Sequence, residues 1–230
     1  MTDEAVSTRA PHDVRFPHES AAYRAARNDL LNAERDLRRQ VEAVAAQRRA
    51  LPLGGEVPED YLFESPAGPV RMTDLFAGKP TLVVYSFMYG PKMEHACPSC
   101  TSMLDGMDGQ VGHVTQQVSL AVVAKSPIGR ITDFAADRGW RRLPLLSSAG
   151  NSYNADYHGE TAEGAQIPAL NVFTRRHGQT FHTYNTELMF ASRDPGQDPR
   201  HVDSIWPLWN VLDLAPGGRG AGWYPRLSYD

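Results

Sequence analysis

The chain has only two cysteines among its 230 residues, and they are Cys97 and Cys100, separated by Pro98 and Ser99. Two thiols at this spacing can form a disulfide with each other or bind a soft metal ion. The segment 81–89 that precedes them is apolar, β-branched and aromatic, and it predicts a buried strand. A Cys-x-x-Cys pair between a strand and the first turn of a helix is the arrangement typical of a redox-active dithiol.

The position of each thiol predicts its role. Pro98 suits the first helical position, where its missing N–H costs nothing. Cys97 would then stand at the helix start, where free backbone N–H groups and the positive helix end lower the pKa of a thiol. We therefore expect Cys97 to be the nucleophile and Cys100, one turn later, to be the resolving thiol. Two neighbours could modulate Cys97, because the carboxylate of Glu94 would raise its pKa and a protonated His95 would lower it.

Pro168 opens a strand predicted over 167–174. In dithiol folds a cis-proline loop opposite the cysteines binds the extended chain of a partner. The sequence is compatible with a cis bond at Pro168, and equally with an ordinary trans proline at a strand start.

Strands and helices alternate along the rest of the chain, which predicts an α/β fold with a layered sheet. The expected organisation is a mobile segment at 1–16, a long amphipathic helix at 17–50, a domain at 56–190, and an insertion with an aromatic docking tail at 191–230. Within the domain we expect short strands at 60–64, 70–72 and 75–76, strands at 81–88, 118–124, 143–147, 167–174 and 179–184, and helices at 98–116 and 128–138. The apolar stripe of the long helix either lies on the domain or forms a homodimer contact.

Composition excludes several classes of protein. The net charge of -4 gives no nucleic-acid-binding footprint. No apolar run approaches the roughly 18–20 residues needed to span a bilayer, and the acidic first twenty residues do not form a secretory signal. We therefore expect a cytoplasmic protein that binds neither membrane nor nucleic acid, whose thiols are kept reduced at rest.

The same two sulfurs support a metal-binding alternative. Cys97 and Cys100, together with one or more of His95, His158 and His182, would suit copper or another soft metal. A structural zinc site is disfavoured because it needs four protein ligands and the chain has two sulfurs. A peroxiredoxin fits less well, since Glu94 stands three residues before Cys97, where peroxide binding requires Thr or Ser.

Residues 60–214 resemble a thioredoxin-like family of uncharacterised function whose members are described as predicted dithiol-disulfide oxidoreductases. The resemblance implies a thioredoxin-like sheet flanked by helices, no required cofactor, and a thiol or disulfide substrate. This chain departs from the pattern at His95 and in an acidic, proline-rich insertion that contains His201. The motifs that carry the resemblance are Phe87-Met88-Tyr89-Gly90-Pro91, Cys97-Pro98-Ser99-Cys100, Leu120-Ala121-Val122-Val123 with Ser126-Pro127, Gly139-Trp140, Phe181-His182-Thr183-Tyr184 and Leu212-Asp213-Leu214-Ala215-Pro216-Gly217-Gly218-Arg219.

Three functions follow as hypotheses. The first is a thiol-disulfide oxidoreductase that uses Cys97 and Cys100. The second is a copper-binding protein or metalloenzyme that uses the same sulfurs with histidine. The third is a redox-inert scaffold that dimerises through residues 17–50.

Overall fold

The computed structural model describes residues 12–195, 197–198, 200–220 and 222–229. Its contacts divide the chain into two compact units, Met1–Pro52 and Leu53–Asp230, which we describe separately. The expected mobile segment 1–16 lies largely outside the described residues. None of the helices in the described ranges is long and apolar enough to cross a membrane.

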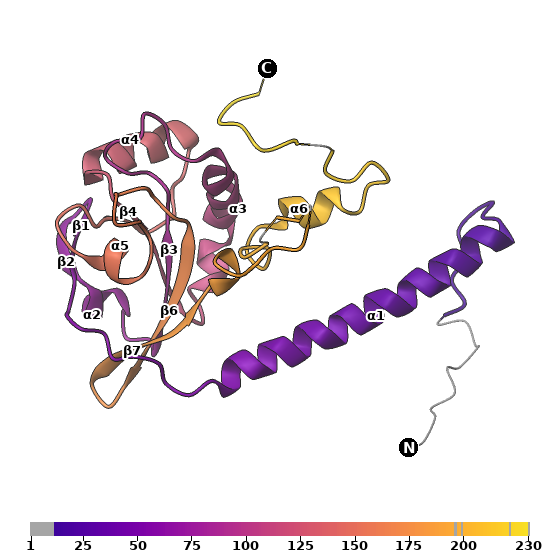
Figure 1. The fold of residues 1–230 in the computed structure, drawn as a ribbon, viewed down its shortest axis with the longest axis horizontal. Helices are drawn as coiled ribbons and strands as arrows, with labels where there is room; N and C mark the ends of the chain where they lie inside the picture. Colours follow the sequence, from indigo (N-terminus) through magenta and orange to yellow (C-terminus); the bar gives the residue numbers. More distant parts are fainter. Residues whose placement is uncertain (1–11, 196, 199, 221, 230) are drawn as a thin grey trace. The chain divides into compact units, whose positions relative to one another are not determined.

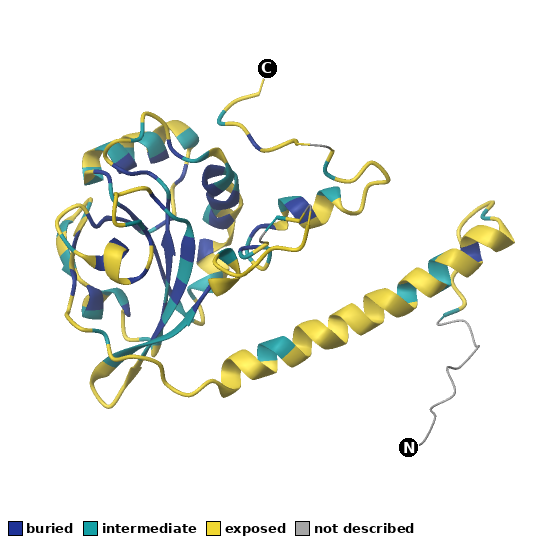
Figure 2. Cartoon of the chain, viewed as in Figure 1, coloured by how far each residue is buried: buried dark blue, intermediate teal, exposed yellow. Residues whose placement is uncertain are grey.

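The first unit is dominated by one helix, α1 (Ala21–Ala50), as the sequence predicts. Ser20 caps it by accepting a hydrogen bond from the N–H of Tyr23 at 3.1 Å. Nearly all of its surface is exposed (Figure 2). Its apolar stripe is exposed too, with Tyr23, Leu30 and Leu37 at 52%, 53% and 65%.

The second unit is built on a mixed sheet, and the expected α/β fold is confirmed. The strands run in the order β2-β1-β5-β4-β3-β6-β7. β3, β4 and β5 are parallel, whereas β6 runs antiparallel to β3 and β7 antiparallel to β6. The bounds are β1 Leu62–Ser65, β2 Gly68–Arg71, β3 Thr81–Ser86, β4 Ser119–Ala124, β5 Leu145–Ser147, β6 Ala169–Arg176 and β7 Gln179–Asn185.

Helices connect the parallel strands and cover the sheet (Figure 1). α4 ends at Gly139, whose φ of 76° lies in the left-handed region that glycine adopts without strain. The helical elements of this unit are α2 Met72–Leu75, α3 Pro98–Val114, α4 Ile128–Arg138, α5 Tyr153–Asp156, η1 Glu187–Met189 and α6 Pro207–Leu212.

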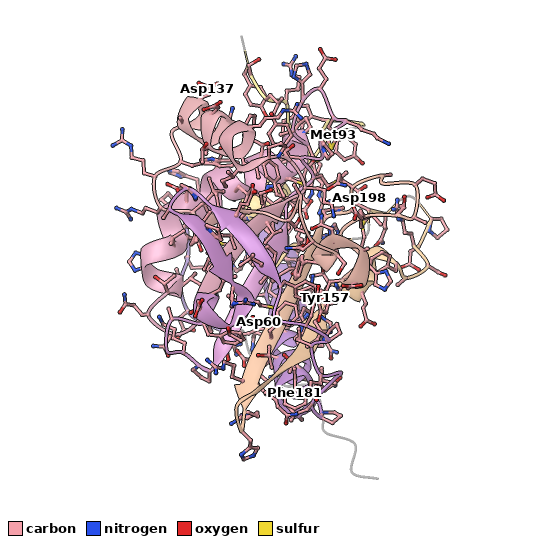
Figure 3. All side chains as sticks on the ribbon, turned by 90° about the vertical axis from the view of Figure 1, so that its left-hand side faces the viewer. Asp60, Met93, Asp137, Tyr157, Phe181 and Asp198 are labelled. Carbon is pink, nitrogen blue, oxygen red and sulfur yellow. The ribbon has the colours of Figure 1, made fainter. Side chains whose placement is uncertain are left out.

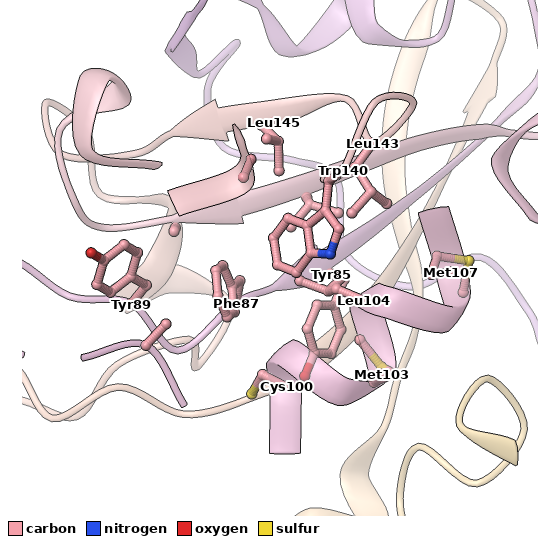
Figure 4. Packing of buried hydrophobic residues seen from close by; sticks show 14 of the residues in the cluster. Tyr85, Phe87, Tyr89, Cys100, Met103, Leu104, Met107, Trp140, Leu143 and Leu145 are labelled. Carbon is pink, nitrogen blue, oxygen red and sulfur yellow. The ribbon is translucent and has the colours of Figure 1, made fainter. Parts of the chain in front are cut away.

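Successive side chains of β3 point to opposite faces of the sheet, and each face is covered by a hydrophobic core of its own. Tyr85 faces the core that contains Cys100 and the apolar side of α3 (Figure 4). Leu82 and Val84 face the opposite core with Phe173. The two faces of the sheet therefore have different chemical surroundings.

The short strands expected at 70–72 and 75–76 are only partly correct, because Met72–Leu75 is the helix α2. The N–H and hydroxyl of Thr73 both donate to the carboxylate of Asp60 at 2.9 Å, which holds the first turn. Buried Met72 and Phe76, four positions apart, then face one core as helical spacing requires.

The C-terminal aromatic segment packs on α3. Val202, Trp206 and Trp209 are buried in the same core as Cys100. The indole N–H of Trp206 donates to Ser102 of α3 at 3.3 Å. The wall of the thiol-containing core is thus completed by residues from the end of the chain.

Candidate active site

The thiol pair lies at the start of α3, where local sequence places it. Cys97 is the N-cap residue and Pro98 the first residue of the helix. The carbonyl of Cys97 accepts from both the N–H and the hydroxyl of Thr101 at 2.9 Å. Both thiols are free; Cys97 is half-buried, whereas Cys100 is 3% exposed.

The two thiols have opposite acidities. A hydrogen bond from the Cys100 thiol, supported by the backbone N–H groups of Cys100 and Ser99, outweighs burial and lowers the pKa of Cys97 to about 6. The same contact with Cys97, together with burial, raises the pKa of Cys100 well above its ordinary value. The pair is therefore arranged as one ionised, accessible sulfur and one protonated, buried sulfur.

Tyr85 is a residue of this site that sequence reasoning missed. Burial, followed by the charge of Cys100, raises the pKa of its phenol well above the ordinary value. The Tyr85 hydroxyl hydrogen-bonds to Cys100 and lowers the pKa of that thiol, against the larger raising effects. Figure 4 shows the Tyr85 ring reaching from β3 toward the first turn of α3. Its place in the strand, on the α3 face, is the signal that could have identified it.

Arg130 of α4 is a second residue that was missed, and it holds the loop leading to the thiols. Its guanidinium donates to the carbonyls of Gly90 at 3.3 Å, Glu94 at 2.9 Å, and Met93. It also lies over the ring of Tyr89, 4.4 Å from the centroid. No sequence motif indicates these contacts, which arise only when α4 packs beside the loop.

The two predicted modulators are exposed. The side chains of Glu94 and His95 are 89% and 72% exposed, and they pair with each other at 3.6 Å. The pKa of Cys97 is lowered first by the Cys100 thiol and then by the backbone N–H groups of its own helix turn. Glu94 takes part in the site through its carbonyl, which Arg130 holds.

Pro168 lies immediately before β6 and is half-buried. No peptide bond in the described ranges is cis, so the trans alternative applies. Gln166, two residues before Pro168, packs against Gly90, where an added Cβ would come within 2.8 Å of the Gln166 side chain. The segment before β6 therefore adjoins the loop that precedes the cysteines.

The histidines proposed as metal ligands are not gathered around the thiols. Within the described residues no group of three His, Cys, Asp or Glu side chains could hold a metal ion. His182 of β7 instead hydrogen-bonds Oδ1 of Asn171 at 2.9 Å, and burial lowers its pKa. His158 packs edge-on against Phe190, with ring centroids 5.9 Å apart.

The strands of this part of the sheet lie in the order β4-β3-β6-β7, and parallel β3 and β4 are joined by a helix that has Cys-x-x-Cys at its start. This arrangement defines a thioredoxin-like protein. Residues 14–229 match the model of DUF899, a family described as bacterial protein of unknown function, and the chain belongs to that family. No curated protein matches its sequence.

Several solved structures match parts of the chain at low sequence identity. Peroxidoxin BcpB from Mycobacterium tuberculosis is 15% identical with a TM-score of 0.45, over 70% of this chain and 98% of that one. AhpC from Enterococcus faecalis is 10% identical with a TM-score of 0.45, over 74% and 98%. The lipoprotein thioredoxin Etrx1 from Streptococcus pneumoniae is 10% identical with a TM-score of 0.41, over 63% and 95%. The class assigned above rests on the strand order and the thiol position.

Proposed function

We propose that the protein is a thiol-disulfide oxidoreductase in which Cys97 is the nucleophile and Cys100 the resolving thiol. The observation that carries this proposal is the pKa of about 6 for a half-buried Cys97, beside a protonated and buried Cys100. A cytoplasmic location belongs to the same proposal, because reducing partners there return the pair to the dithiol.

The reaction exchanges one disulfide for another. The Cys97 thiolate attacks one sulfur of the substrate disulfide, that S–S bond breaks, and the first substrate sulfur leaves as a thiolate. Cys100 then loses its proton and attacks the Cys97 sulfur, which releases the second substrate sulfur. The substrate gains two electrons and becomes a dithiol, and the enzyme ends with a Cys97–Cys100 disulfide.

An aromatic disulfide that releases a coloured thiolate tests each step. Wild-type protein should release two equivalents in two phases, first by attack of Cys97 and then by closure through Cys100. Cys100→Ser should release only the first equivalent and accumulate the mixed disulfide. Cys97→Ser should release neither at neutral pH. Equal reactivity of the two single variants would overturn the assignment of roles.

Metal analysis separates this proposal from the copper alternative. Since the described histidines are not gathered at the thiols, no contact favours a three-ligand copper site. Stoichiometric copper in protein purified without chelator, lost in Cys97→Ser, would replace the oxidoreductase proposal. Protein without bound metal that is active in the exchange assay would support it.

A homodimer through residues 17–50 is part of the proposal. The apolar residues Tyr23, Leu30, Leu37 and Val41 of α1 are between 52% and 65% exposed. Light scattering should give a mass of two chains, and Leu30→Glu should reduce it to one. Wild-type protein that remains monomeric at high concentration would overturn this part alone.

A further inference from the structure

A pocket of about 1070 Å³ lies in the second unit, apart from the thiols. Its floor is formed by Asn171 of β6 with His182 and Asn185 of β7. Asn171 pairs with Val84 and so points to the same face of the sheet, opposite to the face of Tyr85 and Cys100. Its volume suits a small molecule.

The floor contains a buried hydrogen-bond acceptor without a partner. Oδ1 of Asn171 accepts from the amide of Asn185 at 2.7 Å and faces Nε2 of His182 at 2.9 Å. Asn185 is 8% exposed, and its own Oδ1 has no partner among the described groups; Nδ2 of Asn171 is likewise a buried donor without a partner there. Native proteins rarely leave such an atom unpaired, so this amide is suited to a ligand that donates a hydrogen bond.

The rim is acidic and aromatic. Carboxylates of Glu56, Asp156 and Glu187 line it, as do the rings of Tyr157 and Phe190 (Figure 3 labels Tyr157). No lysine or arginine is among the described lining residues. Phe190 is 50% exposed, and its ring packs edge-on against His158.

Asp156 and His182 are held in place by neighbouring residues. Asp156 accepts from the hydroxyls of Tyr61 at 2.7 Å and Ser152 at 2.6 Å, which fix the orientation of its carboxylate. Burial lowers the pKa of His182, so its ring is neutral near pH 7 and supplies no competing cation. The pocket therefore presents negative charge, π faces, an unpaired acceptor on Asn185 and an unpaired donor on Asn171.

We propose that this pocket binds a small organic cation that carries N–H donors, of the amine or guanidine type. Its charge would pair with the carboxylates of Asp156 and Glu187, its flat or methylene portion would lie against Tyr157 and Phe190, and one N–H would reach Oδ1 of Asn185. Anionic ligands of the same size are repelled by the same rim. This site is independent of the thiol chemistry, since neither cysteine lines it.

Agmatine, which has a guanidinium and an ammonium group, is a suitable probe, and glutarate is an anionic control of similar length. Calorimetry on the full chain should detect agmatine and not glutarate, with binding weakened by raising the salt concentration. Glu187→Gln should weaken agmatine binding about fivefold or more, and the exposed position of Glu187 protects the fold. Glu42→Gln on α1 is the matched control and should bind as the wild type does.

Asn185→Ala tests the floor, and its folding is checked by circular dichroism. A folded Asn185→Ala protein that binds agmatine as tightly as the wild type would overturn the proposed acceptor. Equal affinity for agmatine and glutarate, no binding of either, or an equal loss in Glu42→Gln and Glu187→Gln would overturn the site.

Discussion

The guanidinium of Arg130 lies over the ring of Tyr89, 4.4 Å from its centroid. Tyr89 follows β3, and Arg130 lies in the first turn of α4. This contact therefore joins the loop before the thiols to α4. The same guanidinium holds main-chain carbonyls of that loop. Arg130 therefore holds the backbone of the loop that leads to Cys97.

The first prediction concerns the ionisation of Cys97. With a pKa of about 6, its thiolate is fully present at neutral and alkaline pH and is lost as the pH falls through 6. Alkylation by iodoacetamide should therefore reach a plateau above pH 7 and be roughly tenfold slower at pH 5. Cys97→Ser, which retains only buried Cys100, should react slowly across this range. A midpoint of 8 or higher in the wild type would contradict the prediction.

The second prediction concerns Arg130. Arg130→Met removes the hydrogen bonds to the carbonyls of the loop and the contact with Tyr89, so the free energy of unfolding should fall by roughly 1–2 kcal/mol. The midpoint of Cys97 alkylation should move upward, because the thiol is less firmly held against its helix turn. Arg130→Lys should restore part of both effects, since lysine keeps the charge but not the planar fork.

The control for that experiment is Arg141→Met, at an exposed arginine outside the loop. It should leave both the unfolding curve and the alkylation midpoint unchanged. An equal change in the two methionine variants would show that the effect comes from the loss of a positive charge, and not from the loss of the contacts between Arg130 and the loop.

The third prediction concerns Tyr85. Tyr85→Phe removes the hydroxyl that stabilises the ionised form of Cys100. A net hydrogen bond of about 1 kcal/mol corresponds to about fivefold in rate, so closure of the disulfide should slow by about that factor. The attack by Cys97 should change less. Two-phase release from the aromatic disulfide separates the two steps, and a selective loss of the first phase would refute this role.

The fourth prediction concerns the C-terminal segment. Trp206 is 6% exposed against α3, so Trp206→Ala should lower the free energy of unfolding by about 3–5 kcal/mol in urea. Trp223 is 38% exposed, and Trp223→Ala should cost less than about 1 kcal/mol. Similar midpoints for the two variants would show that the segment does not stabilise the core.

Local chemistry made part of this structure predictable. Pro98 after Cys97 identifies the start of α3, and Gly139 identifies the end of α4, because both depend on neighbouring residues only. The alternation of strands and helices likewise predicts the α/β sheet, and the family resemblance implies that it is thioredoxin-like. The helix α2 was misassigned because a side chain thirteen positions earlier, Asp60, holds its first turn.

Contacts between distant parts of the chain could not be predicted. Arg130 and Met93 are 37 positions apart, and no periodicity relates them. The hydrogen bond between His182 and Asn171 depends on the register of β6 with β7, including a bulge at Val172/Phe173. Residue type alone made His158 and His182 candidate ligands of the alternative metal site, and the pairing of β6 with β7 is what directs His182 to the amide of Asn171.

Trp206 is 104 positions from its hydrogen-bond partner Ser102, within a helix that begins directly after Cys97. A ribosome makes the two thiols long before it makes the tryptophans that close over their core. A little under half of the chain is added between Cys100 and Trp206, and this wall of the core is missing during that part of synthesis. Oxidants present at that stage would meet the two sulfurs before the C-terminal tryptophans cover the core around Cys100.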